Sequence, residues 1–199
     1  MEISAGLVKE LREKTGVGMM QCKQALLESR GDLLEAEKLL RKQGVAAAAK
    51  KAGRATGEGL IASYIHTGGK IGVLLEINCE TDFASRSEGF RQLSHELAMH
   101  IAAAAPRYVR REEVTEEVLR DEREIARAQA LKSGKPPAVV DKIVEGKLEK
   151  FYADACLLEQ PFVKDPDKNV GQLVAESVAK IGENIQVRRF ARFVLGDGA

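Results

Sequence analysis

The sequence contains no tryptophan, and only 5% of its 199 residues are aromatic. A platform of aromatic rings on which nucleic-acid bases stack is therefore not expected. Formal charges nearly cancel, with 31 Lys and Arg against 30 Asp and Glu, which gives a net charge of +1. A protein that binds nucleic acid through its phosphates needs a clustered excess of positive charge. The composition thus argues against direct nucleic-acid binding.

Long apolar segments and paired cysteines are missing as well. No run of about 18 apolar residues is present, so no membrane-spanning helix is expected. The first four residues also lack the charged-then-apolar pattern of a signal peptide. Cys22, Cys79 and Cys156 lie far apart and form no CxxC pair, which favours reduced thiols over a disulfide or metal framework. We therefore expect a cytoplasmic protein that binds neither a membrane nor a metal.

Motifs of the common enzyme classes are not found either. His95 and His100 are five residues apart, which rotates them by about 140° around a helix, whereas the histidines of an HExxH zinc motif share one face. Gly69 and Lys70 are followed by Ile71 and so do not form a phosphate-binding P-loop. Sequence alone leaves open a triad assembled from distant residues. Nothing positive in it predicts an enzyme or a cofactor.

Three short helices are predicted over the first 45 residues. Apolar side chains recur at helical spacing over residues 7–11 and 19–26. Asp32 followed by Glu35 is a capping-box pattern that opens a third helix, which Gly44 is expected to close. We interpret this segment as a small helical domain that would be marginally stable alone.

The rest of the chain divides into a linker and a larger unit. The Ala- and Lys-rich segment 46–57 is interpreted as a helical or semi-rigid linker. From residue 58 to 199 the chain forms the larger unit, which starts with a change of period from 3.6 to 2. Apolar residues alternate over 60–64 and 71–79, on either side of a turn that contains Gly68 and Gly69. This pattern predicts a β-hairpin.

Helices and one further strand follow the hairpin. Ser85 is expected to cap a helix that Pro106 ends. Residues 110–124 are rich in charges of both signs and, with the segment that starts at Pro136, predict an antiparallel helix pair. Alternation over 185–195 indicates a last strand. Its residues expected on one face are Ile185, Val187, Ala191, Phe193 and Leu195. The predicted fold class is α+β, with about three antiparallel strands packed with helices.

The turn that follows the apolar strand at 71–79 is the most informative segment. It reads CETDF, and it places Phe83 at a charged turn directly after the strand. Such a ring is either presented to a partner or folded back as a lid on its own core. The pattern alone leaves both interpretations open.

Further short motifs accompany the CETDF turn along the chain. In chain order the segments are TGVGMMQCK at 15–23, CETDF at 79–83, AMHIA at 98–102, SGKP at 133–136, EGK at 145–147, QPFV at 160–163 and IGENI at 181–185. Together, and in this order, these segments resemble the bacterial elongation factor Ts family. They run through nearly the whole chain, so coincidence is very improbable.

The resemblance implies a guanine-nucleotide exchange factor that acts on elongation factor Tu, a GTPase, without itself being an enzyme. It also implies a ubiquitin-associated-like (UBA-like) domain at 1–45 and an elongation factor Ts core, or dimerisation, domain at 58–199. The family mechanism assigns the contact that displaces Mg²⁺ in the GTPase to Thr81, Asp82, Phe83 and Ala84. The resemblance also implies weaker, secondary partner contacts for Met19, Met20 and His66. For Met19 and Met20 the alternative is a core role of one of the pair.

Two further expectations concern partners. Longer members of the family repeat the strand-rich half of the core, whereas this chain has one hairpin and one GEN segment, so the resemblance to the short form implies a homodimer. Phe190 and Val194, on the strand face that is also expected to carry Arg188 and Arg192, are the candidates for that contact. The alternative function is an RNA- or ribosome-binding module. It would use the basic residues Lys50, Lys51, Arg54, Arg188, Arg189 and Arg192.

Overall fold

The computed structural model describes residues 3–133 and 136–197. The elements are α1 (Ala5–Thr15), α2 (Met19–Glu28), α3 (Leu33–Lys51), β1 (Glu58–Ile65), β2 (Ile71–Cys79), α4 (Asp82–Arg86), α5 (Glu88–Ala104), η1 (Arg111–Glu113), α6 (Glu116–Lys132), α7 (Pro137–Ala155), η2 (Leu157–Glu159), β3 (Pro161–Phe162), β4 (Asp165–Asn169), α8 (Val170–Ile181) and β5 (Ile185–Val194). Two compact units are present. The first comprises 1–62, 76–95 and 172–187, and the second comprises 63–75, 96–171 and 188–199.

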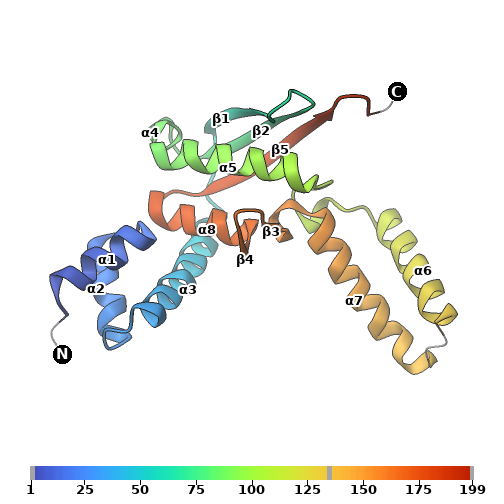
Figure 1. Ribbon diagram of the computed structural model, residues 1–199, viewed down its shortest axis with the longest axis horizontal. Helices are drawn as coiled ribbons and strands as arrows, with labels where there is room; N and C mark the ends of the chain where they lie inside the picture. Colours follow the sequence, from blue (N-terminus) through green and yellow to red (C-terminus); the bar gives the residue numbers. More distant parts are fainter. Residues whose placement is uncertain (1–2, 134–135, 198–199) are drawn as a thin grey trace. The chain divides into compact units, whose positions relative to one another are not determined.

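Helices α1, α2 and α3 pack on one another within the first unit (Figure 1). Their shared core consists of Val8, Leu11, Cys22, Ala25, Leu26, Ala36 and Leu40. The predicted cap at Asp32 is confirmed, because its carboxylate accepts hydrogen bonds from the N–H groups of Leu34 and Glu35 at 2.9 and 3.0 Å. The reciprocal half of the capping box is not formed. Instead, the Glu35 carboxylate accepts a hydrogen bond from Lys38.

The prediction that Gly44 closes the third helix is wrong, since α3 continues to Lys51. Gly44 is buried, and a Cβ added there would lie 3.4 Å from the Cβ of Ala179 on α8. The glycine therefore permits a close approach of two helices, and it does not act as a stop signal. The first residues of the segment interpreted as a linker belong to α3, in agreement with its helical interpretation.

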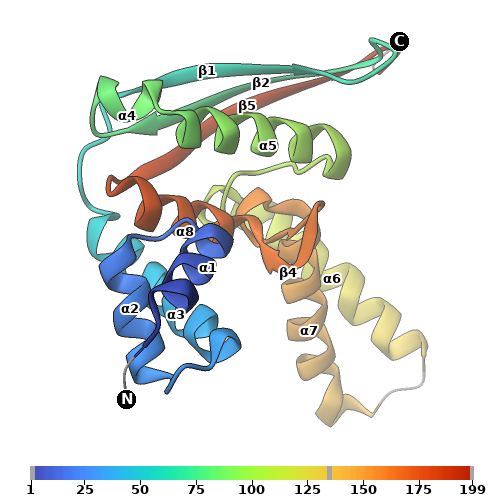
Figure 2. The ribbon, with the colours of Figure 1, turned by 60° about the vertical axis from the view of Figure 1, so that its left-hand side comes forward.

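A three-stranded sheet with the order β1-β2-β5 carries the hairpin. The N–H of His66 donates to the carbonyl of Ile71 at 2.9 Å, and the turn between them contains Gly68 and Gly69 at positive φ. Alternate residues of β2 are buried, and helix α5 runs along the sheet (Figure 2). The large apolar side chains of α5 that are buried are Phe90, Leu93, Leu97 and Ile101. The α+β fold class is thus confirmed.

The predicted alternation of the last strand is wrong in its second half. Ile185 and Val187 are buried, but Phe193 and Leu195 are exposed. Two consecutive exposed residues, Arg188 and Arg189, interrupt the alternation, as a β-bulge does, and every later side chain changes face.

The change of face also bears on Phe190 and Val194, the residues expected at a dimer contact, which are half-buried. The Arg192 guanidinium donates two hydrogen bonds to the carbonyl of Ala102 on α5, at 3.1 and 3.2 Å. The strand face that carries Arg192 and Phe190 is therefore turned toward the helix, and the open face is the one with Phe193 and Leu195.

Helices α6 and α7 form the predicted helix pair (Figure 1). Their contact is made of small and branched apolar side chains: Ala126, Ala130, Val140 and Val144. Gly134 and Lys135, which belong to one of the family-like motifs, lie outside the described residues. The short antiparallel pair β3-β4 was not predicted.

Candidate partner-binding site

The turn after β2 is organised by Thr81. Its backbone is extended, and its hydroxyl accepts a hydrogen bond from the N–H of Ala84 at 3.2 Å, so Thr81 is the N-cap of α4. The thiol of Cys79 donates to the Thr81 carbonyl at 3.1 Å. Because α4 has only five residues, it gains little stability from its own hydrogen bonds. The contacts around Thr81 therefore stabilise the turn.

Phe83 points away from the core. Its side chain is 83% exposed, whereas that of the next residue, Ala84, is 3% exposed. The two lie on different sides of α4, so Ala84 anchors the helix and Phe83 is free for contact. Beside the ring, Asp82 forms an ion pair with Arg86 at 2.9 Å, and both side chains are largely exposed. The interpretation of Phe83 as a lid on its own core is wrong.

Hydrogen bonds to two carboxylates, Glu183 and Glu80, join this turn to the segment after α8, and each carboxylate accepts from the other segment. The Glu183 carboxylate accepts from the Thr81 N–H at 3.0 Å and from the Thr81 hydroxyl at 2.6 Å. The Glu80 carboxylate accepts from the N–H of Asn184 at 2.6 Å. That backbone hydrogen bond, with a contribution from Arg54, lowers the pKa of Glu80, while burial and the charge of Glu183 raise the pKa of the Cys79 thiol.

The end of α3 and the residues after it are held by the same segment. The Asn184 side chain is buried and donates to the carbonyls of Ala52 and Arg54, at 3.3 and 2.9 Å. The Lys51 ammonium donates to the carbonyl of Gly182 at 2.7 Å. Glu80, Glu183 and Asn184 were not predicted as site residues. The only sequence signal for two of them was the IGENI motif.

The secondary candidates are all exposed, but they do not belong to one unit. Met19 and Met20 open α2 and are 53% and 76% exposed, which excludes the alternative core role for both. They belong to the first unit, as do residues 81–84. His66 lies at the hairpin turn in the second unit, where its Nδ1 is 3.0 Å from the Tyr64 hydroxyl.

The two helix histidines have no metal-binding arrangement. His100 is fully buried, and its Nδ1 accepts from the N–H of Val163 at 3.3 Å, so Nε2 carries the proton and donates to Gln160 at 2.9 Å. Burial lowers the pKa of His100. His95 is exposed. Within 3–133 and 136–197, no three His, Cys, Asp or Glu side chains are grouped as metal ligands would be. None of the helices in these ranges has the length and apolarity needed to cross a membrane.

Basic residues considered for RNA binding have internal partners in several cases. Lys51 binds the Gly182 carbonyl, Arg54 forms an ion pair with Glu80 at 3.3 Å, and Arg192 binds a carbonyl of α5. These contacts occupy cationic groups that the alternative function would need for nucleic-acid phosphates.

The fold and the site together define an α+β protein whose candidate site is an exposed aromatic side chain on a hydrogen-bonded turn, a form suited to contact with a protein surface. Comparison with known proteins gives the family. The family model described as Elongation factor TS matches residues 46–177. Elongation factor Ts of Anaeromyxobacter dehalogenans (strain 2CP-C) is 63% identical over 197 residues, which cover 99% of this chain and 90% of the relative.

Two further relatives agree. Elongation factor Ts of Geobacter sulfurreducens is 60% identical, with 100% of this chain and 92% of the relative covered. The protein of that name from Solibacter usitatus is 58% identical, with 98% and 92% covered. The chain therefore belongs to the elongation factor Ts family, and it is a translation elongation factor.

Proposed function

We propose that this protein is a guanine-nucleotide exchange factor that binds elongation factor Tu in its GDP form and promotes GDP release, so that GTP can bind. It acts in the cytoplasm by protein–protein contact, without a chemical step or a cofactor of its own. The observation that carries the proposal is the exposure of Phe83 on a turn held by Glu183. Membership of the elongation factor Ts family supports it.

The mechanism is a displacement of the Mg²⁺ that the GTPase holds. In such GTPases Mg²⁺ bridges nucleotide phosphates to protein oxygens and neutralises their charge. Insertion of Phe83, with Thr81, Asp82 and Ala84 around it, shifts the elements that position the ion. GDP then loses much of the charge neutralisation that holds it. Since binding free energies are reciprocal, GDP weakens the binding of the exchange factor by the same factor.

Phe83 does not act alone in this mechanism. Each tenfold weakening of GDP binding needs about 1.4 kcal/mol of contacts that form only with the loosened state. One buried Phe contributes roughly 1.5–3 kcal/mol. We assign a second contact to Met19 and Met20, whose flexible, polarizable side chains suit a surface that adapts to a partner. His66 has a weaker, third assignment. In this view 1–45 is a separate UBA-like domain, 46–57 a linker and 58–199 the core domain.

Release of mant-GDP from purified elongation factor Tu tests the function directly. The full-length protein at catalytic amounts should accelerate release well above the spontaneous rate. Equal rates with and without the protein would refute the exchange activity.

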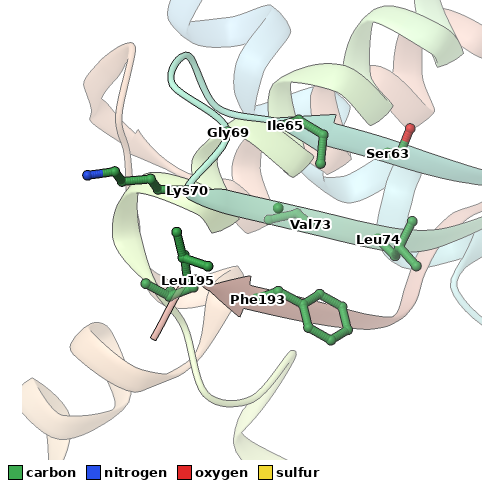
Figure 3. A pocket seen from close by; sticks show the side chains of 10 residues that line it. Ser63, Ile65, Gly69, Lys70, Val73, Leu74, Phe193 and Leu195 are labelled. Atoms are coloured by element: carbon green, nitrogen blue, oxygen red, sulfur yellow. The ribbon is translucent and has the colours of Figure 1, made fainter. Parts of the chain in front are cut away.

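We also propose that the protein is a homodimer that associates through the open face of its sheet. Ile65, Leu74, Phe193 and Leu195 expose apolar side chains from three neighbouring strands and line one open groove (Figure 3). An exposed apolar face of this kind marks an interaction site, and the occupant we propose is the same face of a second copy, related by a two-fold axis.

Light scattering over micromolar concentrations tests the dimer. Twice the monomer mass is expected, and Leu195→Glu should reduce it to the monomer mass because it places a charge in the interface. Leu131→Glu, at an exposed leucine of α6, is the matched control. A monomer mass for the unmodified protein throughout would contradict the dimer.

A further inference from the structure

Three segments that are far apart in the sequence are joined by hydrogen bonds in the first unit. They are the end of α3 with residues 52–54, the turn at 80–84 and the segment 182–186. Glu183 lies in the third of these segments, half-buried, and both of its carboxylate oxygens accept hydrogen bonds from Thr81. The exposed Phe83 is therefore carried by a turn whose geometry depends on a residue 102 positions away.

We propose that Glu183 is a positioning residue for nucleotide exchange, which holds the Thr81 turn so that Phe83 is presented in its binding conformation before the partner arrives. This inference rests on the proposed exchange function and extends it to a residue that does not itself contact the partner.

The hydrogen-bond chemistry of Thr81 explains how one carboxylate controls the turn. A hydroxyl has one proton to donate and two lone pairs to accept with. A carboxylate can only accept, so the Thr81 proton must point to Glu183 Oε1, at 2.6 Å. A lone pair is then directed at the N–H of Ala84, which it accepts at 3.2 Å as the helix cap. The second oxygen of Glu183 accepts from the Thr81 backbone and fixes the residue that precedes α4.

The anchor of Glu183 is itself fixed. Glu80 accepts from the Asn184 backbone, and the Asn184 side chain binds two carbonyls that follow α3. Lys51 binds the carbonyl of Gly182. The segment 182–184 is thus held on both sides of Glu183, so the carboxylate has little freedom to follow a turn that moves. This is the arrangement that a positioning residue requires.

Preorganisation of a side chain increases affinity, because its ordering no longer has to occur on binding. The cost of ordering one interface side chain corresponds to about a 2- to 12-fold change in affinity. Loss of the Glu183 carboxylate should therefore weaken exchange by about 3- to 10-fold at subsaturating concentrations of the factor, and less at saturation.

The test is a double-mutant cycle in the mant-GDP release assay with the full-length chain. Glu183→Gln keeps the shape of the side chain but replaces one acceptor by a donor, and it should reduce stimulated release by the stated factor. In the Phe83→Ala background the same change should alter the rate less than twofold, because there is no ring left to position. Glu124→Gln, at an exposed glutamate on α6, is the matched control with an unchanged rate.

Hydrogen exchange gives a second readout that does not depend on the partner. The amides of Thr81 and Ala84 should exchange faster in Glu183→Gln, with the thermal midpoint nearly unchanged. Glu80→Gln, which removes the reciprocal carboxylate, serves as the second variant if Glu183→Gln folds poorly, and it should show the same pattern with a smaller effect.

The outcomes separate the two proposals. Normal stimulation by Glu183→Gln, or an equal effect of this change with and without Phe83, would overturn the positioning role while the exchange function stands. No stimulation by the unmodified protein would overturn both. A loss that disappears in the Phe83→Ala background, with faster amide exchange at the turn, supports the role of Glu183.

Discussion

Replacement of Phe83 by alanine is the most direct test of the proposed site, and its size can be worked out from the structure. Because 83% of the side chain is exposed, nearly all of its apolar surface is available to be buried by a partner. Complete burial of such a side chain contributes about 1.5–3 kcal/mol, and the exposed fraction corresponds to about 1.2–2.5 kcal/mol. Phe83→Ala should thus reduce the rate of stimulated GDP release by about 8- to 70-fold at subsaturating concentrations.

The same exposure predicts that folding is almost unaffected. The free energy of unfolding should change by no more than about 0.5 kcal/mol, as is usual for a surface substitution, so urea unfolding separates a lost contact from a lost fold. Ile125→Ala removes an apolar side chain of α6 that is 51% exposed, and it should leave exchange unchanged. The reasoning is refuted if Phe83→Ala stimulates mant-GDP release like the unmodified protein, or if both variants lose activity to the same extent.

Three further predictions concern stability and the second contact. Gly59 has φ +148°, and a Cβ there would lie 2.2 Å from the carbonyl oxygen of Ile77. Gly59→Ala should therefore destabilise the protein in urea unfolding by at least about 1–3 kcal/mol, whereas Gly57→Ala, with open space around it, should not. Equal unfolding midpoints of the two variants would contradict this prediction. Burial lowers the pKa of His100 below 6.5, so below that pH the unfolded chain binds more protons than the folded one. The free energy of unfolding should therefore fall as the pH drops below about 6.5, by up to about 1.4 kcal/mol per pH unit. His100→Gln should lack this part of the pH dependence, and identical slopes for the two proteins would count against the prediction. Met20→Ala should slow stimulated GDP release by about 5- to 50-fold with an unchanged urea midpoint, and a normal rate would remove Met20 from the contact.

Much of the fold could be predicted because its signals are local. The hairpin followed from alternation on both sides of Gly68 and Gly69, and the start of α3 from Asp32. Gly44 misled because a glycine that ends a helix and one that lets two helices approach closely have the same sequence signature. The partner of that approach, Ala179, is 135 positions away, and no local pattern indicates it.

In the candidate site, too, the features with local sequence signals could be predicted, and those that depend on distant residues could not. Thr81 and Phe83 were found because they follow a strongly apolar strand and match a family motif. A helix of five residues, such as α4, is too short to show a repeating apolar pattern in the sequence. The prediction that Ser85 caps the next helix is wrong. In the structure the Ser87 hydroxyl accepts from the N–H of Phe90. The role of Glu183 depends on a contact over 102 positions, which neither spacing nor propensity can supply.

The proposed exchange function requires the exposed apolar residues of the first unit to act together. Three decades of GDP weakening need about 4 kcal/mol, and Phe83 contributes at most about 2.5 kcal/mol when its exposed surface is buried. Met19 and Met20 together expose somewhat more than one whole methionine side chain, which corresponds to about 2–4 kcal/mol. Together the two contacts correspond to about 3–6.5 kcal/mol, and ordering consumes about 0.5–1.5 kcal/mol for each mobile side chain, so the requirement is met most easily when Phe83 is already held in place before binding. A five-residue helix cannot hold Phe83 in place by itself, so the carboxylate of Glu183 determines whether the turn contributes its full share.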